Sequence, residues 1–189
     1  MRYKERSEEK REQFEQELEQ IKKKQKETNK GNIIYIDESW IDHNEIKNRS
    51  WSPIGKPILS EQYGYKYKRT TLIAWVKWDT VLSPMRFEWS TDTEIFNIWI
   101  EKYLSNELHA GDVVVLDNAS FHKSEKTKIL IEKKGAKILY LPPYSPDFNP
   151  IENYWALLKL HVRKHNSSFD IFYKILDDFL KIDKWRYAS

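Results

Sequence analysis

Three carboxylates in this chain stand where strands or helices are expected to end or begin. Asp37 ends the apolar run 33–36, and Asp117 ends the apolar run 113–116. Glu152 lies 35 positions after Asp117, behind an Asn-Pro pair that predicts the first turn of a helix. Side chains at the ends of such elements can face one common site, so we expect these three acids to meet.

Clustered carboxylates favour a hard divalent cation, because Mg²⁺ and Mn²⁺ prefer oxygen ligands and take only a few from the protein. A pair of such ions can activate an attacking water or hydroxyl and stabilise the leaving oxygen of a phosphodiester. The acids therefore indicate a two-metal site for Mg²⁺ or Mn²⁺ and phosphoryl transfer on nucleic acid.

Each acid also has a purely structural interpretation. An aspartate at a strand end often forms an Asx turn, and a glutamate in the first helical turn is favoured by free backbone N–H groups. Asp37 and Glu38 are adjacent, so they face opposite sides if the strand continues, and only one can enter the site directly. We choose Asp37, and we prefer Glu152 to Asp147, which lies in a proline-rich loop.

Three segments carry a family resemblance: YIDES, VVVLDNASFHKS and LPPYSPDFNPIENYW. They resemble the signature blocks of mariner-superfamily bacterial insertion-sequence transposases, DDE enzymes with an RNase H-like catalytic core. The resemblance covers roughly residues 31–165. It implies that Asp37, Asp117 and Glu152 are the catalytic acids and metal ligands, that a DNA phosphodiester is hydrolysed at the element end, and that the released 3′-hydroxyl attacks target DNA. It also implies a TA-type target and a homodimer.

Four further residues are candidates for substrate binding. Asn118 either contacts substrate, holds the Asp117 carboxylate or simply forms a turn. His122 resembles a histidine commonly found at this place in relatives and is expected to touch the scissile phosphate or the metal-bound water, although a lone histidine is usually structural. Arg163 and Lys164 belong to a basic helix surface that either follows a phosphate backbone or is merely solvated.

Two aromatic or histidine patterns favour structure over chemistry. Trp155 lies three residues after Glu152, hence on nearly the same helical face, and is expected to pack and fix that helix. His161 and His165 have the i, i+4 spacing of a zinc pair, but Val162 occupies the place of the HExxH glutamate, so we do not expect zinc.

The order of elements predicts an α/β fold: an RNase H-like mixed central sheet flanked by helices, with an N-terminal charged helix. We expect residues 1–30 to form a charged helical connector and residues 31–189 the catalytic domain. Strands are expected near 33–37, 68–77, 81–89, 113–117 and 137–140, and helices near 2–26, 93–108, 124–134, 150–165 and 169–181. The proline-rich stretch 142–146 is interpreted as a stiff loop that orients the Glu152 helix.

Composition restricts the remaining choices. The net charge is only +3, so DNA affinity must come from local basic patches. The absence of cysteine excludes disulfides and thiolate metal sites and fits a reducing compartment. No apolar stretch has the length of a membrane span, so we expect no membrane partner and a cytoplasmic, nucleoid-associated bacterial protein.

The resemblance also implies a missing part. Relatives carry an N-terminal helix-turn-helix region that reads the element ends, and the segment before Asp37 is too short for it. We therefore expect a separate or fused helix-turn-helix region, and DNA of the element ends and the target as partners. Two alternatives stay open: a hydrolysis-only RNase H-like nuclease, and a catalytically silent DNA-binding or dimerising remnant.

Overall fold

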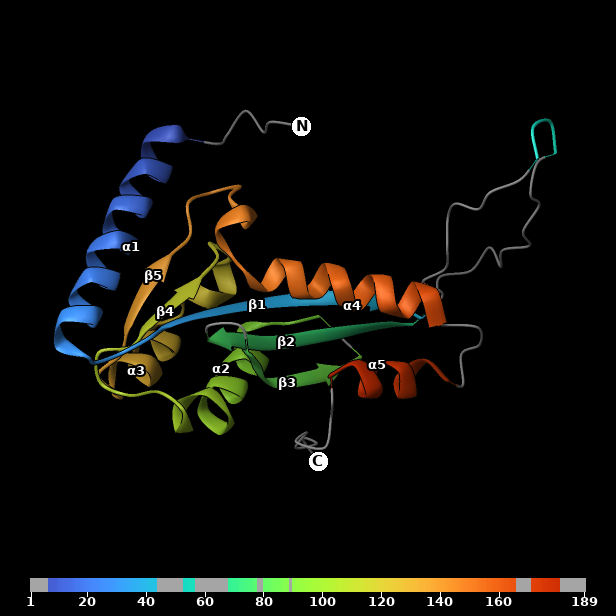
Figure 1. The fold of residues 1–189 in the computed structure, drawn as a ribbon. Helices are drawn as coiled ribbons and strands as arrows, with labels where there is room; N and C mark the ends of the chain where they lie inside the picture. Colours follow the sequence, from blue (N-terminus) through green and yellow to red (C-terminus); the bar gives the residue numbers. More distant parts are fainter. Residues whose placement is uncertain are drawn as a thin grey trace.

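A five-stranded mixed sheet forms the centre of the computed structural model, which describes residues 7–43, 53–56, 68–77, 80–88, 90–165 and 171–180. The strand order is β3-β2-β1-β4-β5, with antiparallel pairing among the first three strands and parallel pairing from β1 through β4 to β5 (Figure 1). The strands are β1 (Ile33–Asp42), β2 (Arg69–Lys77), β3 (Thr80–Phe87), β4 (Val113–Leu116) and β5 (Lys137–Tyr140).

Helices cover both faces of this sheet. Apolar residues of α2 and α3 pack with one face, while those of α4 and α5 pack with the opposite face of β1 and β2. The N-terminal helix α1 packs on β4 and β5. The α-helices are α1 (Glu8–Thr28), α2 (Thr93–Lys102), α3 (Glu125–Glu132), α4 (Ile151–His165) and α5 (Phe172–Leu180), and the short 3-10 helices are η1 (Leu104–Asn106), η2 (Ser120–Lys123) and η3 (Pro146–Phe148).

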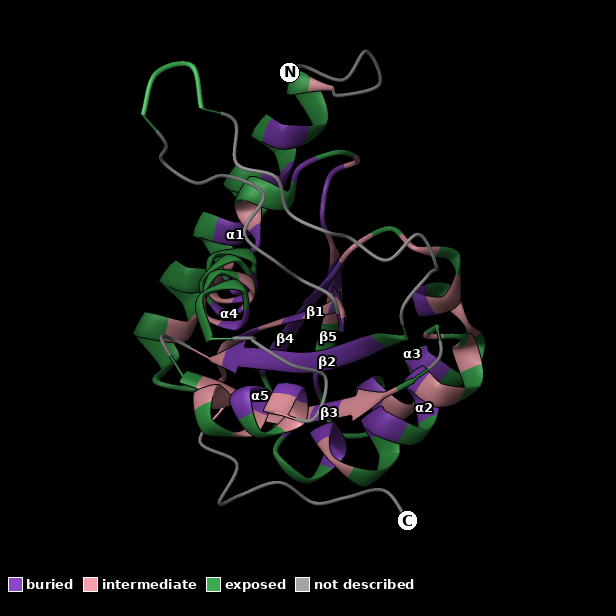
Figure 2. Cartoon of the chain, turned by 90° about the vertical axis from the view of Figure 1, so that its right-hand side faces the viewer, coloured by how far each residue is buried: buried purple, intermediate pink, exposed green. Residues whose placement is uncertain are grey.

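Burial follows from this layering. All four residues of β4 are buried, as expected for a central parallel strand covered on both faces (Figure 2). In β1 and β2 the buried side chains divide between the two apolar clusters on the two faces. The sheet therefore fixes the strand ends that carry the acids.

Most expected elements are present, with shifted boundaries. The first strand does not end at Asp37 but continues to Asp42, because residues 37–42 still pair with β2. The expected helix 93–108 ends at Lys102 and is followed by η1. Asp92 caps its start, accepting a hydrogen bond from the backbone N–H of Ile95. The expected end of the third strand at Trp89 lies outside the described residues.

The charged N-terminal helix is docked on the sheet. Phe14 and Leu18 are buried against β4 and β5, and Ile21 packs beside them, so the stripe expected from the sequence is the contact face. Among the described residues, no helix is long and apolar enough to cross a membrane.

Candidate active site

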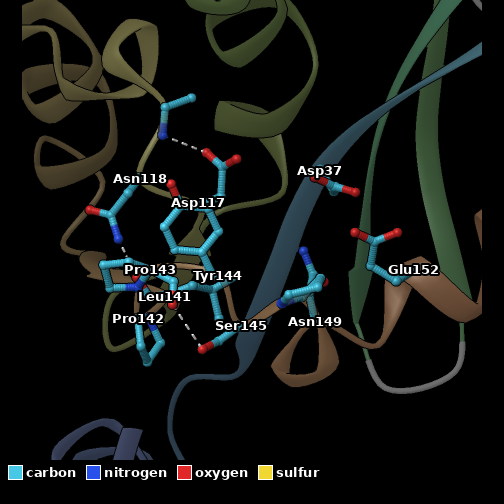
Figure 3. Close-up of a pocket in the computed structure, with 12 residues that line it drawn as sticks. Asp37, Asp117, Asn118, Leu141, Pro142, Pro143, Tyr144, Ser145, Asn149 and Glu152 are labelled. Atoms are coloured by element: carbon cyan, nitrogen blue, oxygen red, sulfur yellow. Dashed lines mark hydrogen bonds between the residues drawn. The ribbon is translucent and has the colours of Figure 1, made fainter. Parts of the chain in front are cut away.

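A pocket of about 420 Å³ brings the three predicted acids to one place. Asp37 comes from the middle of β1, Asp117 from the loop after β4, and Glu152 from the first turn of α4 (Figure 3). The loop 141–146 forms another part of the wall.

The register of the β1–β4 pairing explains why Asp37 and Asp117 lie at the same height along the two strands. The parallel pairing of β1 with β4 joins Ile33 to Val113 and Tyr35 to Val115. The same offset relates Asp37 to Asp117, so these residues follow the paired segments by equal lengths of chain. Because the pairing stops at Tyr35, the two strands separate there and the pocket opens between the acids.

Asp37 lies in a strongly unfavourable environment for a negative charge. Burial, together with Glu38, Glu152 and Asp117 nearby, raises the pKa of Asp37 to about 8. Its carboxylate accepts a hydrogen bond of 3.1 Å from the indole N–H of Trp155. Without a cation, the carboxyl group of Asp37 is therefore mostly protonated at neutral pH.

Glu152 is held relative to Asp37 by a buried asparagine. The amide of Asn149 donates to the carbonyl oxygen of Ile36 at 3.2 Å, directly before Asp37, and its side-chain oxygen accepts from the backbone N–H of Ile151 at 3.3 Å. The first of these bonds ties the start of α4 to β1, and the second caps the helix. Burial raises the pKa of Glu152, Lys159 opposes this, and Asp117 adds to it.

Trp155 confirms the expected packing role and adds a contact that the sequence did not reveal. It is 1% exposed, so it fixes α4 against the sheet rather than facing substrate. Its hydrogen bond to Asp37 orients one carboxylate oxygen of the pocket. The i, i+3 spacing from Glu152 was the signal that could have suggested this.

Asp117 is oriented by a turn and by a histidine. Its Oδ1 accepts from the backbone N–H of Ala119 at 2.8 Å, which is the Asx turn considered for it, and lies 2.6 Å from Nδ1 of His122. The other ring nitrogen of His122 lies 3.1 Å from Oε1 of Glu38. Burial opposes a charged His122, but the hydrogen bonds to Asp117 and Glu38 outweigh it and raise the histidine pKa to about 9. Burial likewise opposes the Asp117 anion, and His122 and Ala119 together lower the pKa of Asp117.

This placement corrects the expected role of His122. The side chain is fully buried and both ring nitrogens face carboxylates, so it does not reach a substrate phosphate. Glu38 does not line the pocket, as strand alternation predicted. Its carboxylate instead contacts the ring nitrogen of His122 that faces away from Asp117. The reason is tertiary, since η2 and β1 meet only in the folded chain.

Asn118 lines the pocket and also has a structural contact. Its amide donates to the carbonyl oxygen of Leu141, which joins the loops after β4 and β5. Tyr144 in the facing loop is 49% exposed and has a positive φ of 55°, a sparsely populated conformation for a residue with a side chain. Strain of this kind is common where surrounding structure fixes a functional loop.

Arg163 and Lys164 do not line this pocket. Both lie on the exposed last turn of α4, eleven or more residues beyond Glu152 and hence about 16 Å or more along the helix axis. His161 and His165 contact each other, with ring centroids 4.2 Å apart. The predicted substrate contact of Arg163 and Lys164 therefore concerns a surface outside the acidic pocket.

The N-terminal helix is anchored beside the segment that leads into α4. Arg11, only 8% exposed, donates to both carboxylate oxygens of Asp147 at 3.0 and 2.6 Å. Its guanidinium lies 4.0 Å from the ring centroid of Phe148, and Phe14 stacks on the same ring. Asp147 is thus a structural partner of α1, which supports the choice of Glu152 over it. Sequence reasoning missed Arg11, because its partner is distant in the chain.

The donor set suits a hard divalent ion. Carboxylate oxygens are the ligands that Mg²⁺ and Mn²⁺ prefer, and burial and the neighbouring carboxylates that raise the pKa of Asp37 are conditions that a bound cation would relieve. Within the part of the chain that the structure describes, no three acidic or histidine side chains are already arranged to share one ion. The acids therefore line a common pocket without forming a finished coordination shell.

Comparisons with known proteins agree with this geometry. The Tc3 transposase of Caenorhabditis elegans is 31% identical over 98 residues, which are 51% of this chain and 29% of that protein. The uncharacterised protein y4pE/y4sA of Sinorhizobium fredii strain NBRC 101917 / NGR234 is 36% identical over 50 residues, 26% of this chain and 35% of that protein. The matched part is thus about a third of the length of each relative.

Solved structures of Mos1 transposase show the same fold. The Mos1 mariner paired-end complex with Mn has a TM-score of 0.69 at 17% identity, covering 97% of this chain and 59% of that one. The Mos1 catalytic domain has a TM-score of 0.60 at 16% identity, covering 94% of this chain and 84% of that one. These structures confirm the predicted RNase H-like α/β fold.

The family match is the most extensive of the sequence findings. Residues 32–172 match the family described as DDE superfamily endonuclease, and this segment contains Asp37, Asp117 and Glu152. Because the match covers most of the sequence, this chain belongs to the DDE superfamily endonuclease family.

Proposed function

We propose that this domain is the catalytic part of a transposase, performing metal-dependent DNA phosphodiester hydrolysis and strand transfer during DNA transposition. The observation that carries this proposal is the convergence of Asp37, Asp117 and Glu152 from three separate elements on one pocket. The family match and the Tc3 and Mos1 likenesses support it.

We assign Asp37, Asp117 and Glu152 as the residues that would hold Mg²⁺ or Mn²⁺. When bound, such ions supply charge stabilisation to the attacking and leaving oxygens of a phosphodiester. Solved Mos1 structures with Mn and with Mg support this choice.

The remaining residues of the site orient these acids. Trp155 hydrogen-bonds Asp37, Asn149 fixes the start of the Glu152 helix against β1, and His122 holds Asp117. Because Asp37 is mostly protonated without a cation, binding an ion at neutral pH must displace a proton from it.

The proposal is tested by joining of DNA ends. The purified chain is incubated with Mn²⁺, a supercoiled plasmid and a fluorescent duplex that has a recessed 3′-hydroxyl, and covalent joining is scored on a denaturing gel. Wild type is expected to give joined product, and D37N, D117N and E152Q none. E125Q is the matched control, because Glu125 also lies in the first turn of a helix but is exposed and outside the pocket.

Each other outcome has a definite meaning. Joining that survives in all three acid variants would refute the assignment of the site. Cleavage without joining would identify the hydrolysis-only nuclease. DNA binding that needs no metal and leads to no cleavage would identify the silent remnant.

Partners follow from the same proposal. The neighbouring structures include a Mos1 paired-end complex with a transposon end and a Mos1 strand transfer complex, which supports DNA as the partner here. A homodimer and a helix-turn-helix region, separate or fused, stay predictions from the sequence resemblance. The homodimer prediction is tested by measuring the molar mass of the chain, with and without DNA, by light scattering.

A further inference from the structure

Trp40 is a large exposed aromatic side chain on β1, the strand that carries Asp37. It lies in β1 three residues after Asp37 and is 49% exposed, whereas the three other tryptophans among the described residues are at most 1% exposed. In this part of β1 only β2 is paired among the described strands, because pairing with β4 stops at Tyr35. The exposure of Trp40 is thus a feature of the open side of the central strand.

Two cations lie against this indole ring. The guanidinium carbon of Arg69 in β2 is 4.0 Å from the ring centroid, and Nζ of Lys159 in α4 is 5.1 Å from it. Both distances are within the range of cation–π attraction, which holds a cation over an aromatic face without neutralising its charge. Trp40, Arg69 and Lys159 together form what we call the Trp40 platform.

The platform keeps hydrogen-bonding capacity for an anion. Arg69 is 54% exposed and donates its Nε–H to Asp42 at 3.0 Å, and its terminal N–H groups have no hydrogen-bond partner among the described residues. No carboxylate among the described residues is within ion-pairing distance of Lys159. Among the described residues, Asp42 therefore offsets the charge of Arg69, and no carboxylate pairs with Lys159.

Lys159 joins the platform to the helix that carries Glu152. Lys159 follows Glu152 by seven residues, so both lie on nearly the same face of α4, about 10 Å apart along its axis. Their charges interact, since Lys159 opposes the rise in the Glu152 pKa. Nζ of Lys159 reaches the Trp40 ring from α4, so this lysine links the helix that carries Glu152 to Trp40 and Arg69 in the sheet.

We infer that the Trp40 platform is a phosphate-binding site that holds the DNA backbone flanking the bond that reacts at the acidic pocket. Arginine and lysine held at fixed positions are typical contacts to backbone phosphates, which position a nucleic acid without reading its sequence. The choice of DNA as the polyanion rests on the proposed function. The platform itself goes beyond it, because it assigns binding to residues outside the acidic pocket.

Equilibrium binding in EDTA tests the platform without any dependence on catalysis. The anisotropy of a fluorescein-labelled duplex is titrated with the 189-residue chain between about 0.05 and 0.2 M salt. Loss of one phosphate contact is expected to reduce the slope of log K against log salt by about 0.9 and to weaken binding about eightfold at 0.1 M salt. We expect this for K159Q, with binding retained in K159R.

A pair of controls separates a specific contact from general charge. The double variant R69Q/D42N leaves the net charge unchanged, yet it is expected to lose the same slope as K159Q. K128Q on the exposed surface of α3 changes the net charge by as much as K159Q and is expected to bind like wild type. W40L keeps both cations but not their fixed position, so we expect a loss of about two- to fivefold with the slope unchanged.

Several results would overturn the inference. These are a wild-type chain that does not bind the duplex, platform variants that bind like wild type, or K128Q that is as defective as K159Q. Far-ultraviolet circular dichroism of each variant verifies folding before titration. Binding through the platform in a chain that fails to join DNA ends would retain this inference and reject the proposed function, so the two can fail separately.

Discussion

Replacing Asp37 with asparagine removes a charge that the folded protein tolerates poorly. Burial and three neighbouring carboxylates raise the pKa of Asp37 to about 8, from 3.8 for an ordinary aspartate. Asparagine has nearly the same shape, cannot ionise, and can still accept the hydrogen bond from the indole of Trp155. We therefore expect D37N to increase the free energy of unfolding of the metal-free protein.

The magnitude follows from proton linkage. The unfolded chain releases the Asp37 proton near pH 4, while the folded protein keeps it until about pH 8, so wild-type stability falls as the pH rises through this window. At about 1.36 kcal/mol per pH unit, the advantage of D37N is at most about 2 kcal/mol at pH 5 and about 4 kcal/mol at pH 7. It approaches a constant value above pH 8.

Urea unfolding in EDTA at pH 5, 7 and 8 measures this difference. D178N is the matched control, because Asp178 lies on the exposed side of α5, and its stability should equal that of wild type at each pH. Adding Mn²⁺ should stabilise wild type and not D37N. A D37N protein that is no more stable than wild type at pH 8, or whose advantage does not grow with pH, would refute this account of the pocket.

Substitutions at four further residues test the contacts that hold the site and the N-terminal helix. N149A should destabilise the protein by about 1–2 kcal/mol in urea unfolding and weaken Mn²⁺ binding in calorimetry, while N149S keeps a cap acceptor, adds no charge and loses the bond to Ile36. H122Q should lower the free energy of unfolding by up to about 3 kcal/mol below pH 6.5, and this loss should shrink toward pH 9. The reason is that a raised histidine pKa stabilises the fold only while the ring is protonated. A loss that does not depend on pH would contradict a charged His122. R11A and D147A should show a coupling of about 1 kcal/mol in a double-mutant cycle, since Asp147 is half exposed, and additive effects would mean that this ion pair does not anchor α1.

Several elements could be predicted from local sequence alone. The strand Lys137–Tyr140 has the expected bounds, and the helix Ile151–His165 begins one residue after its expected start. Both could be predicted because the β-branched residues, the capping residues and the periodic apolar positions that favour these elements lie within the elements or next to them in the sequence. The predicted end of β1 at Asp37 was wrong, because β2, which is distant in the sequence, pairs with residues 37–42. The predicted end of α2 at Leu108 was wrong, because the α-helix ends at Lys102 and the 3-10 helix η1 follows it.

The site divides in the same way. The sequence by itself determined the identity of the three acids and the alternation that turns Asp37 toward the pocket and Glu38 away from it, since strand geometry reverses successive side chains. Only the tertiary structure decided that His122 is enclosed between Asp117 and Glu38, that Asn149 ties α4 to β1, and that Lys159 meets Trp40. These contacts join residues far apart in the chain, and their energies depend on burial that no local pattern specifies.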